Sequence, residues 1–252
     1  MIDIQNMLSF VRKACENYDM IRDGDVIGVG VSGGKDSLTL LVTLAELRRF
    51  YPENYTLKAL TVDMGFPDTD YSPIKEFCEK IGVEYTVIPS QIYEIIFNVR
   101  KESNPCSLCA RMRRGAINDA AKLIGCNKLA LGHNYDDVVE TVLLNLFYAG
   151  RFGSFLPVTY LDRSEITVIR PLIYAPERDV AAFARNAELP IVKSNCPANG
   201  NTEREEMKKL MYDLQKNNKS LVKNIFGALE RNPSAGFEKH SRTDRIGQTN
   251  TD

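Results

Sequence analysis

The sequence predicts an α/β fold: an open, mainly parallel sheet with helices on both faces, followed by a small C-terminal helical segment. Three observations support this class. Short β-branched runs alternate with helical patterns, the first run ends in a glycine-rich turn before a helix, and two polar helical patterns follow Cys196. Alternating strands and helices favour a parallel sheet, because each crossover helix covers one of its faces. A chain of 252 residues is long enough for one such core and a small appendage.

The spacing of apolar residues predicts the elements in chain order. An amphipathic helix is expected over residues 1–18. The predicted strands are 26–31, 57–62, 84–88, 127–131, 166–169 and 190–192. The predicted helices are 37–50, 72–81, 90–99, 109–124, 135–148, 176–187, 202–216 and 219–230. In the first of these, Leu38, Leu41 and Ala45 recur at the spacing of a helix face that packs on a core.

We divide the chain into three parts. Residues 1–199 form the main α/β domain, which includes the N-terminal helix and the cysteines that lie outside apolar patterns. Residues 200–232 form a helical extension. Residues 233–252 are polar and aperiodic and are predicted to be a disordered tail, in which His240 is expected to be a solvated side chain.

Charge and hydropathy limit the classes of function. The net charge is -1 and the pI is about 6.2, so contact with nucleic acid requires a local basic patch. Residues 99–128 supply one, with seven basic and two acidic side chains. No apolar run reaches the roughly 18 residues that span a bilayer, and the first residues lack the pattern of a signal peptide. We therefore expect a cytoplasmic protein without a membrane partner.

The segment VIGVGVSGGKDS, residues 26–37, predicts a phosphate site. A strand, a glycine-rich turn and a helix N-terminus bring unpaired backbone N–H groups and the positive end of the helix dipole together. Two better-known motifs do not fit. The Walker A pattern fails because Lys35 is followed by Asp36. The G-x-G-x-x-G pattern from Gly28 to Gly33 lacks the acidic residue expected about 20 positions later for a ribose.

The loop Ser-Gly-Gly-Lys-Asp-Ser resembles that of the ATP pyrophosphatase (PP-loop) superfamily, whose fold is adenine nucleotide alpha hydrolase-like. Members split ATP into AMP and pyrophosphate while they adenylate a carbonyl oxygen. The residue types suit that chemistry: the glycines allow close backbone approach, the lysine adds a charge, the serines offer hydroxyls, and the aspartate suits Mg²⁺. The residues predicted to bind ATP here are Ser32, Gly33, Gly34, Lys35, Asp36 and Ser37.

Two other loops are expected beside the phosphate loop. In an open α/β sheet the ligand lies outside the carboxyl ends of the strands, where residues 63–71 and 132–135 form the next connections. The first of these begins with Asp63, and the second contains His133. Together the loops predict a nucleotide crevice, with Asp63 and His133 among the residues that bind the nucleotide.

The six cysteines separate by context. Cys15, Cys78 and Cys126 lie in apolar patterns and are predicted to be buried. The other three lie in polar surroundings and are predicted to carry chemistry: Cys106, Cys109 and Cys196. A Cys-x-x-Cys pair alone is compatible with half a zinc site, a redox dithiol, a persulfide carrier or ligands of an iron–sulfur cluster. Three thiolates on a [4Fe–4S] cluster would leave one iron open to an exogenous ligand.

Several motifs in order resemble the tRNA 2-thiocytidine synthase (TtcA-like) family of the ATP pyrophosphatases. They are the loop at 32–37, Cys-Ser-Leu-Cys with Arg-Met-Arg-Arg-Gly at 106–115, Leu-Gly-His-Asn-Tyr-Asp-Asp at 131–137, Leu-Asn-Leu-Phe-Tyr-Ala-Gly at 144–150, Ile-Arg-Pro-Leu at 169–172, and Cys196. The resemblance implies ATP, Mg²⁺ and a [4Fe–4S] cluster on the three cysteines. It also implies thiolation of C2 of cytidine in a tRNA anticodon loop.

The resemblance also assigns roles. Lys35, Asp36, Asp137 and the three cysteines are implied as catalytic residues, and tRNA phosphates would lie on the basic residues Arg111, Arg113 and Arg114. A cysteine desulfurase or sulfide would donate the sulfur, and a homodimer is the expected assembly. Asn134 replaces the second histidine that follows Gly-His in many family members. A role that requires paired imidazoles is therefore not expected of His133.

Three alternatives follow from the same residues. A 2-thiouridine synthase of the superfamily would keep the chemistry and change the target base. A lysidine-type tRNA ligase would use the ATP loop but not the cysteines. A non-catalytic sensor that binds ATP, an iron–sulfur cluster and RNA would release no pyrophosphate.

Overall fold

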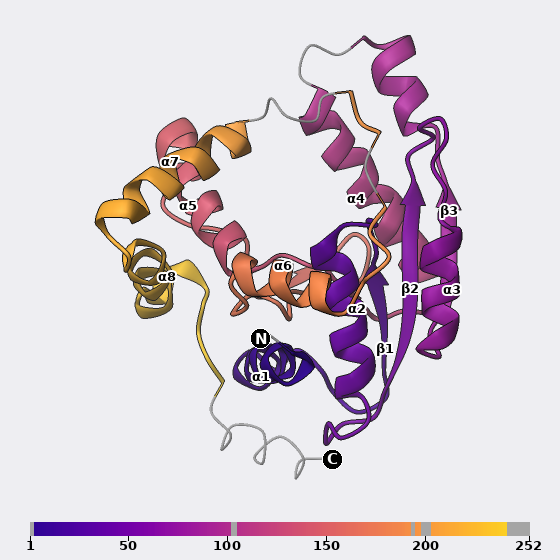
Figure 1. Cartoon of the computed structure of the whole chain (residues 1–252), viewed down its shortest axis with the longest axis horizontal. Helices are drawn as coiled ribbons and strands as arrows, with labels where there is room; N and C mark the ends of the chain where they lie inside the picture. The colour runs from indigo at the N-terminus through magenta and orange to yellow at the C-terminus, as the bar shows by residue number, and fades with distance from the viewer. Residues whose placement is uncertain (1–2, 102–104, 193–194, 198–202, 241–252) are drawn as a thin grey trace.

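The computed structural model describes residues 3–101, 105–192, 195–197 and 203–240. A six-stranded sheet of order β3-β2-β1-β4-β6-β5 forms its centre, and every neighbouring pair is parallel except β5 with β6 (Figure 1). The strands are β1 (Asp25–Gly30), β2 (Tyr55–Asp63), β3 (Glu84–Pro89), β4 (Lys128–Ala130), β5 (Val158–Leu161) and β6 (Ile166–Ile169). The predicted α/β class with a mainly parallel sheet is confirmed.

The helices are α1 (Ile4–Asn17), α2 (Lys35–Leu47), α3 (Ser72–Lys80), α4 (Pro105–Leu123), α5 (Tyr135–Ala149), α6 (Glu177–Asn186), α7 (Glu203–Asn217) and α8 (Leu221–Arg231). A π-helical segment covers Glu94–Val99, and a 3₁₀ turn covers Pro233–Ala235. Within the described residues, no helix has the length and apolarity needed to cross a membrane.

The order of the strands fixes where a ligand can bind. The chain runs from β1 outward through β2 to β3, and then returns to place β4 on the other side of β1. The connections that follow β1 and β4 therefore leave the sheet in opposite directions, which opens a crevice at the carboxyl ends of these two strands. The phosphate loop follows β1, and the segment from Leu131 to Asn134 follows β4.

The two faces of β1 carry different side chains because neighbouring residues of a strand point to opposite faces. Ile27 and Val29 are fully buried in the larger core with α1, α2 and α6. Gly28 lies on the side of α4, where a Cβ would come within 2.9 Å of Leu60 Cδ1 and 3.2 Å of Cys126 Sγ. A Cβ on Gly30 would likewise come within 2.9 Å of Ile117 Cδ1 on α4, so these two glycines of the dinucleotide-like motif provide room for α4 to pack on the sheet.

The differences from the prediction include a strand that is not formed, an additional strand and an earlier helix start. Residues 190–192 are not a strand; instead the Val192 N–H donates to the Gly33 carbonyl, 3.0 Å away, and covers the phosphate loop. Strand β5 was not predicted, because this four-residue strand lies at the sheet edge and is not fully buried. Helix α4 begins at Pro105 rather than at 109, so Cys106 lies within its first turn.

The prediction of a disordered tail from Pro233 is wrong for the part that the structure describes. Phe237 is 1% exposed and packs edge-on against Tyr18 and Phe226. The backbone N–H of His240 donates to the carbonyl of Asn17, 2.8 Å away, although its side chain is exposed. One aromatic side chain with a core to enter outweighs a polar composition. The rest of the predicted tail, 241–252, lies outside the described residues.

We predict that Phe237→Ala lowers the free energy of unfolding by about 3 to 5 kcal/mol, because it removes a buried ring from between two others. Phe50→Ala is the matched control, since Phe50 is 55% exposed and should cost less than about 1 kcal/mol. Urea unfolding of the three proteins measures both values. Equal stabilities of the two variants would show that residues 233–240 do not belong to the core.

Candidate active site

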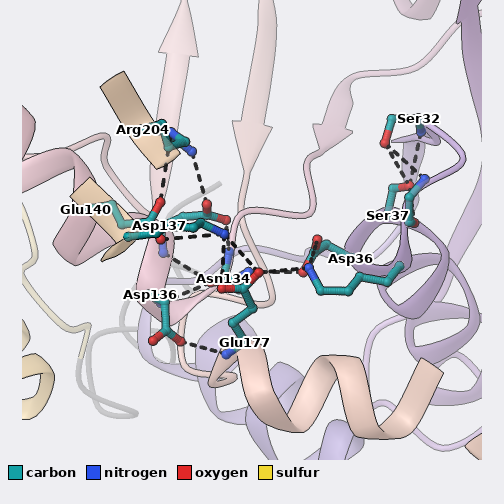
Figure 2. A network of polar contacts seen from close by, with 12 residues as sticks. Ser32, Asp36, Ser37, Asn134, Asp136, Asp137, Glu140, Glu177 and Arg204 are labelled. Atoms are coloured by element: carbon teal, nitrogen blue, oxygen red, sulfur yellow. Dashed lines mark hydrogen bonds and ion pairs between the residues drawn. The ribbon is translucent and has the colours of Figure 1, made fainter. Parts of the chain in front are cut away.

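The phosphate loop is held in place by its two serines. The hydroxyl of Ser37 accepts from the backbone N–H of Ser32 at 3.1 Å and donates to the carbonyl of Gly34 at 3.0 Å. The two hydroxyls lie 3.2 Å apart (Figure 2). Gly33 has a φ of +82°, and a Cβ there would lie 3.1 Å from Val192 Cβ, so glycine is required. The loop is therefore folded for an anion before any ligand binds.

The backbone after β4 lies directly against this loop. A Cβ on Gly132 would come within 3.0 Å of the carbonyl carbon of Asp36 and 3.1 Å of the backbone nitrogen of Ser37. A glycine at this position lets the β4 loop reach the N-terminus of α2. The phosphate loop and the loop after β4 therefore converge, as predicted, through a close approach of their backbones.

Asp36 links the two loops through its carboxylate. Its Oδ1 accepts from Asn134 Nδ2 at 3.0 Å, and its Oδ2 accepts from Lys35 Nζ at 2.8 Å (Figure 2). Asn134 also caps α5, where its side-chain oxygen accepts from the backbone N–H groups of Asp136 and Asp137. Asn134 therefore both orients Asp36 and caps the N-terminus of α5.

Lys35 lies between two carboxylates. Besides Asp36, its Nζ donates to Glu177 Oε1 at 3.0 Å, at the first residue of α6. Burial lowers the pKa of Lys35, but the two carboxylates more than offset this, so the pKa lies above its ordinary value. The ammonium group is charged at neutral pH and is oriented toward the loop by fixed partners.

Helix α7 closes the network from the C-terminal part of the chain. Arg204 Nη1 donates to Asp137 Oδ1 at 3.1 Å, and Lys208 Nζ donates to Glu177 Oε1 at 2.9 Å. Lys208 also lies 3.7 Å from Glu140, which is 1% exposed. The sequence analysis missed Arg204, Lys208, Glu140 and Glu177. The sequence did contain a signal for two of them: Arg204 and Lys208 are four residues apart, a spacing that places both side chains on one face of a helix.

Three acidic side chains of this network have raised pKa values: Asp136, Asp137 and Glu140. In Glu177, by contrast, burial is outweighed by hydrogen bonds from Lys208 and Lys35, which lower its pKa. The pKa of Glu140 is raised to about 7. Burial is the largest cause, the charge of Lys208 acts against it, and the charge of Asp137 adds to it. Burial also raises the pKa values of Asp136 and Asp137 above their ordinary range. Asp137 nevertheless accepts from the backbone N–H of Asn134 at 3.0 Å, so its carboxyl is fixed in place.

His133 is a neutral histidine beside the network. Burial lowers its pKa to about 3, and the positive charges of Arg170, Arg204, Arg113 and Arg114 act in the same direction. Its ring lies 4.6 Å from the ring of Phe155. Its Nδ1 is buried and has no hydrogen-bond partner among the described residues. A neutral imidazole can donate or accept a hydrogen bond but carries no charge to a substrate.

Asp63 lies at the end of β2, as predicted, but outside this network. Its Oδ1 accepts from the backbone N–H of Gly65 at 3.0 Å and lies 3.4 Å from the Tyr71 hydroxyl, which donates to it. Gly65 has a φ of +78°. Asp63 therefore shapes the loop after β2, and its contact with a nucleotide stays a prediction.

The three cysteines predicted to carry chemistry are linked by the electrostatics of Cys109. Cys106 and Cys109 lie one turn apart on α4, where Cys106 is exposed and Cys109 is half-buried. Burial raises the pKa of Cys109, Arg113 lowers it, and the thiols of Cys196 and Cys106 raise it further, so Cys109 lies within electrostatic range of both. Among the described residues, no three His, Cys, Asp or Glu side chains are already arranged to hold a metal ion.

The predicted basic surface lies on the same helix. Arg111, Arg113 and Arg114 are exposed on α4, and the charges of Arg113 and Arg114 act on His133. The helix that carries two of the thiols therefore also presents positive charge toward the crevice.

A phosphate loop at the point where strand order reverses, with a carboxylate network beside it, defines a nucleotide-binding domain of the PP-loop class. Residues 5–213 match the model of the PP-loop domain family. The chain belongs to that class and, within it, to the family of tRNA-cytidine(32) 2-sulfurtransferases.

The relatives cover most of the chain. It is 43% identical to the tRNA-cytidine(32) 2-sulfurtransferase of Geobacter sulfurreducens over 222 residues, which are 87% of this chain and 86% of the relative. It is 38% identical to the protein of that name from Ralstonia pickettii, over 88% of this chain and 71% of the relative.

A solved structure is also similar: the U34-tRNA thiolase NcsA from Methanococcus maripaludis with its [4Fe-4S] cluster. The TM-score is 0.74 with 29% sequence identity, covering 90% of this chain and 78% of that one.

We predict that Glu140→Gln flattens the pH dependence of stability. The unfolded carboxyl ionises at its ordinary pKa, whereas the folded one keeps its proton to about pH 7. The contribution of Glu140 to the free energy of unfolding therefore falls as the pH rises from the ordinary carboxyl pKa to about 7. Thermal unfolding from pH 4.5 to 8 should show a shallower decline in the variant. The control is Glu165→Gln at an exposed side chain, which should leave the slope above pH 5 unchanged. An unchanged slope in Glu140→Gln would contradict the buried network.

Proposed function

We propose that this chain is an ATP-dependent tRNA sulfurtransferase that replaces the C2 oxygen of cytidine with sulfur, at position 32 as in the names of its relatives. The observation that carries the proposal is a phosphate loop of the PP-loop class in a chain where two further cysteines, Cys106 and Cys196, act electrostatically on Cys109. A ligase of the same class would need the loop but not the thiols.

The loop supplies the adenylating half of the reaction. The C2 oxygen attacks the α-phosphorus of ATP, the bond to the β-phosphate oxygen breaks, and pyrophosphate leaves. The backbone N–H groups at the N-terminus of α2 and the Lys35 ammonium group offset the charge on the leaving pyrophosphate. Adenylation turns a poor leaving group into AMP, which a sulfur nucleophile then displaces.

Mg²⁺ is part of the proposal. Asp36, Asp136, Asp137 and Glu177 outnumber the three cations that contact this group, Lys35, Arg204 and Lys208. Mg²⁺ is commonly held by one or two carboxylates together with substrate phosphates, which suits an ion that arrives with ATP. Asp36 is the residue we assign to it, because its carboxylate lies in the first turn of α2 beside the phosphate loop.

The three thiols supply the sulfur-transfer half. Their donor type fits an iron–sulfur cluster, and two of them share one face of a helix turn. NcsA, with 29% identity, holds a [4Fe-4S] cluster, and we assign the equivalent group here to Cys106, Cys109 and Cys196. When bound, the cluster would supply an iron open to a sulfur ligand. Arg113 beside Cys109 favours the thiolate form that metal ligation requires.

Two further residues position the substrate. Neutral His133 can hydrogen-bond the base or the ATP phosphates without adding charge. Asp137, fixed by Asn134 and Arg204, can orient the same groups. Arg111, Arg113 and Arg114 are assigned to tRNA phosphates, since they are exposed on the helix that carries the cysteines.

The proposal also includes a sulfur donor, which is sulfide or a cysteine desulfurase, a cytoplasmic location and a homodimer. The homodimer is supported by the exposed apolar side chains Phe147, Tyr148 and Phe152 at and beyond the end of α5, which are of the kind found at interfaces. Light scattering of the purified chain measures its mass in solution.

A second candidate function is thiolation of uridine. It is supported by the likeness to NcsA, a U34-tRNA thiolase. The fold and site would be the same, and the target base would differ. The identity to the cytidine enzymes is higher and makes cytidine the first choice.

We predict that deleting the gene removes 2-thiocytidine from bulk tRNA, as measured by nucleoside mass spectrometry. Restoring the natural chain should restore the nucleoside. Loss of a thiouridine instead would favour the second candidate, and loss of lysidine would favour a ligase. No change in any modified nucleoside would contradict the proposed enzyme and favour a sensor.

We also predict that Cys106→Ala, Cys109→Ala and Cys196→Ala each fail to restore 2-thiocytidine in the deletion strain, with a loss of at least about 100-fold, because each removes one assigned ligand. Cys126→Ala is the matched control, since that cysteine is buried in a core cluster with Leu60 and Leu129. It should restore the nucleoside. Full activity of the three variants would contradict thiol chemistry.

A further inference from the structure

Arg170 is the residue of the Ile-Arg-Pro-Leu motif that the proposed function does not use. It follows β6 directly, at the carboxyl edge of the sheet beside β4. Its Nη1 donates to the carbonyl of Leu156 at 2.6 Å and lies 3.3 Å from Thr159 Oγ1. Its Nε is buried and has no hydrogen-bond partner in the described part of the chain. The guanidinium group therefore has donor capacity that the protein does not use.

The aromatic ring of Phe155 joins Arg170 to His133. The Arg170 Cζ lies 4.9 Å from the centre of this ring, and the His133 ring lies 4.6 Å from it. Both neighbours of the ring carry an unpartnered buried nitrogen, Arg170 Nε and His133 Nδ1. Two orphan polar atoms on one aromatic platform mark a place where a polar ligand belongs.

The charge around this platform is positive. Burial, together with the charge of Arg114, lowers the pKa of Arg170 to about 10, so the side chain remains charged at neutral pH. Among the described residues no carboxylate pairs with it, whereas Lys35, Arg204 and Lys208 each pair with two. A buried cation without a counter-ion is costly, and a bound anion would compensate it.

We propose that Arg170, on the platform of Phe155 and beside His133, is a phosphate-binding residue of this site. The proposal rests on the proposed function, which brings two sources of phosphate to the same sheet edge: ATP and the tRNA backbone. The planar guanidinium fork matches the oxygens of a phosphate group in either source.

Binding measured without turnover tests this proposal and separates the sources. Purified Arg170→Met is titrated with MgATP in one series and with bulk tRNA in another, by calorimetry. We expect the affinity for one of these ligands to fall at least about tenfold, while the affinity for the other stays the same. If tRNA is the source, the slope of log affinity against log salt concentration should also decrease by about 0.7 for one lost phosphate contact. Unchanged affinity for both ligands would overturn the proposal.

Two further variants separate binding from a structural role. Thr159→Val removes a hydroxyl that accepts a hydrogen bond from the guanidinium group but leaves the charge of Arg170 in place, and both affinities should stay the same. If Thr159→Val weakens binding as much as Arg170→Met, Arg170 acts through the β5 loop and the proposal fails. Arg170→Lys keeps a charge without the fork and serves if Arg170→Met does not fold. It should bind the affected ligand about three- to tenfold more weakly, and wild-type affinity for both ligands would overturn the proposal.

These results do not depend on sulfur transfer. If Arg170→Met loses affinity for a phosphate ligand but the gene deletion leaves 2-thiocytidine in place, the binding residue stands and the proposed reaction fails. If the deletion removes 2-thiocytidine and the variants bind both ligands normally, the reaction stands and this inference fails.

Discussion

The contact between Gly132 and the N-terminus of α2 is the constraint on which the site depends. Because a side chain at this position would collide with the backbone of Asp36, the β4 loop can reach the phosphate loop only through a glycine. This close approach brings Asn134 within hydrogen-bond distance of Asp36. Asn134 in turn caps α5, so the positions of α5 and of the carboxylates in its first turns follow from the same contact.

Charge compensation then ties the C-terminal helices to the nucleotide site. The carboxylates of α5 and α6 are buried or half-buried, and their charges would be costly without partners. Helix α7 supplies two of these partners, Arg204 and Lys208. Figure 1 shows α7 beside α5 and apart from β2 and β3. In the sequence, α7 comes shortly after Cys196. The same stretch of chain therefore carries a proposed cluster ligand and then the cations that hold the carboxylates.

Local patterns predicted the parts of the site that are contiguous in sequence. The strand, turn and helix around Lys35 formed as predicted, and context alone separated the three buried cysteines from Cys106, Cys109 and Cys196. The partners of Lys35 could not be predicted in this way, because Glu177 reaches it from α6, far along the chain. Likewise, Val192 was assigned to a strand since an apolar residue looks the same whether it pairs in a sheet or covers a loop. Phe237 was missed because a single aromatic residue has no period.

Coupling of ATP cleavage to sulfur transfer is the central claim of this account. The most direct measurement uses the chain reconstituted with iron and sulfide under nitrogen, with ATP and tRNA from cells that lack the gene. AMP and 2-thiocytidine are then counted in the same reaction. We expect about one AMP for each 2-thiocytidine formed, and no AMP above background without tRNA. Formation of 2-thiocytidine without AMP, or of AMP with tRNA but without a thiolated nucleoside, would contradict it.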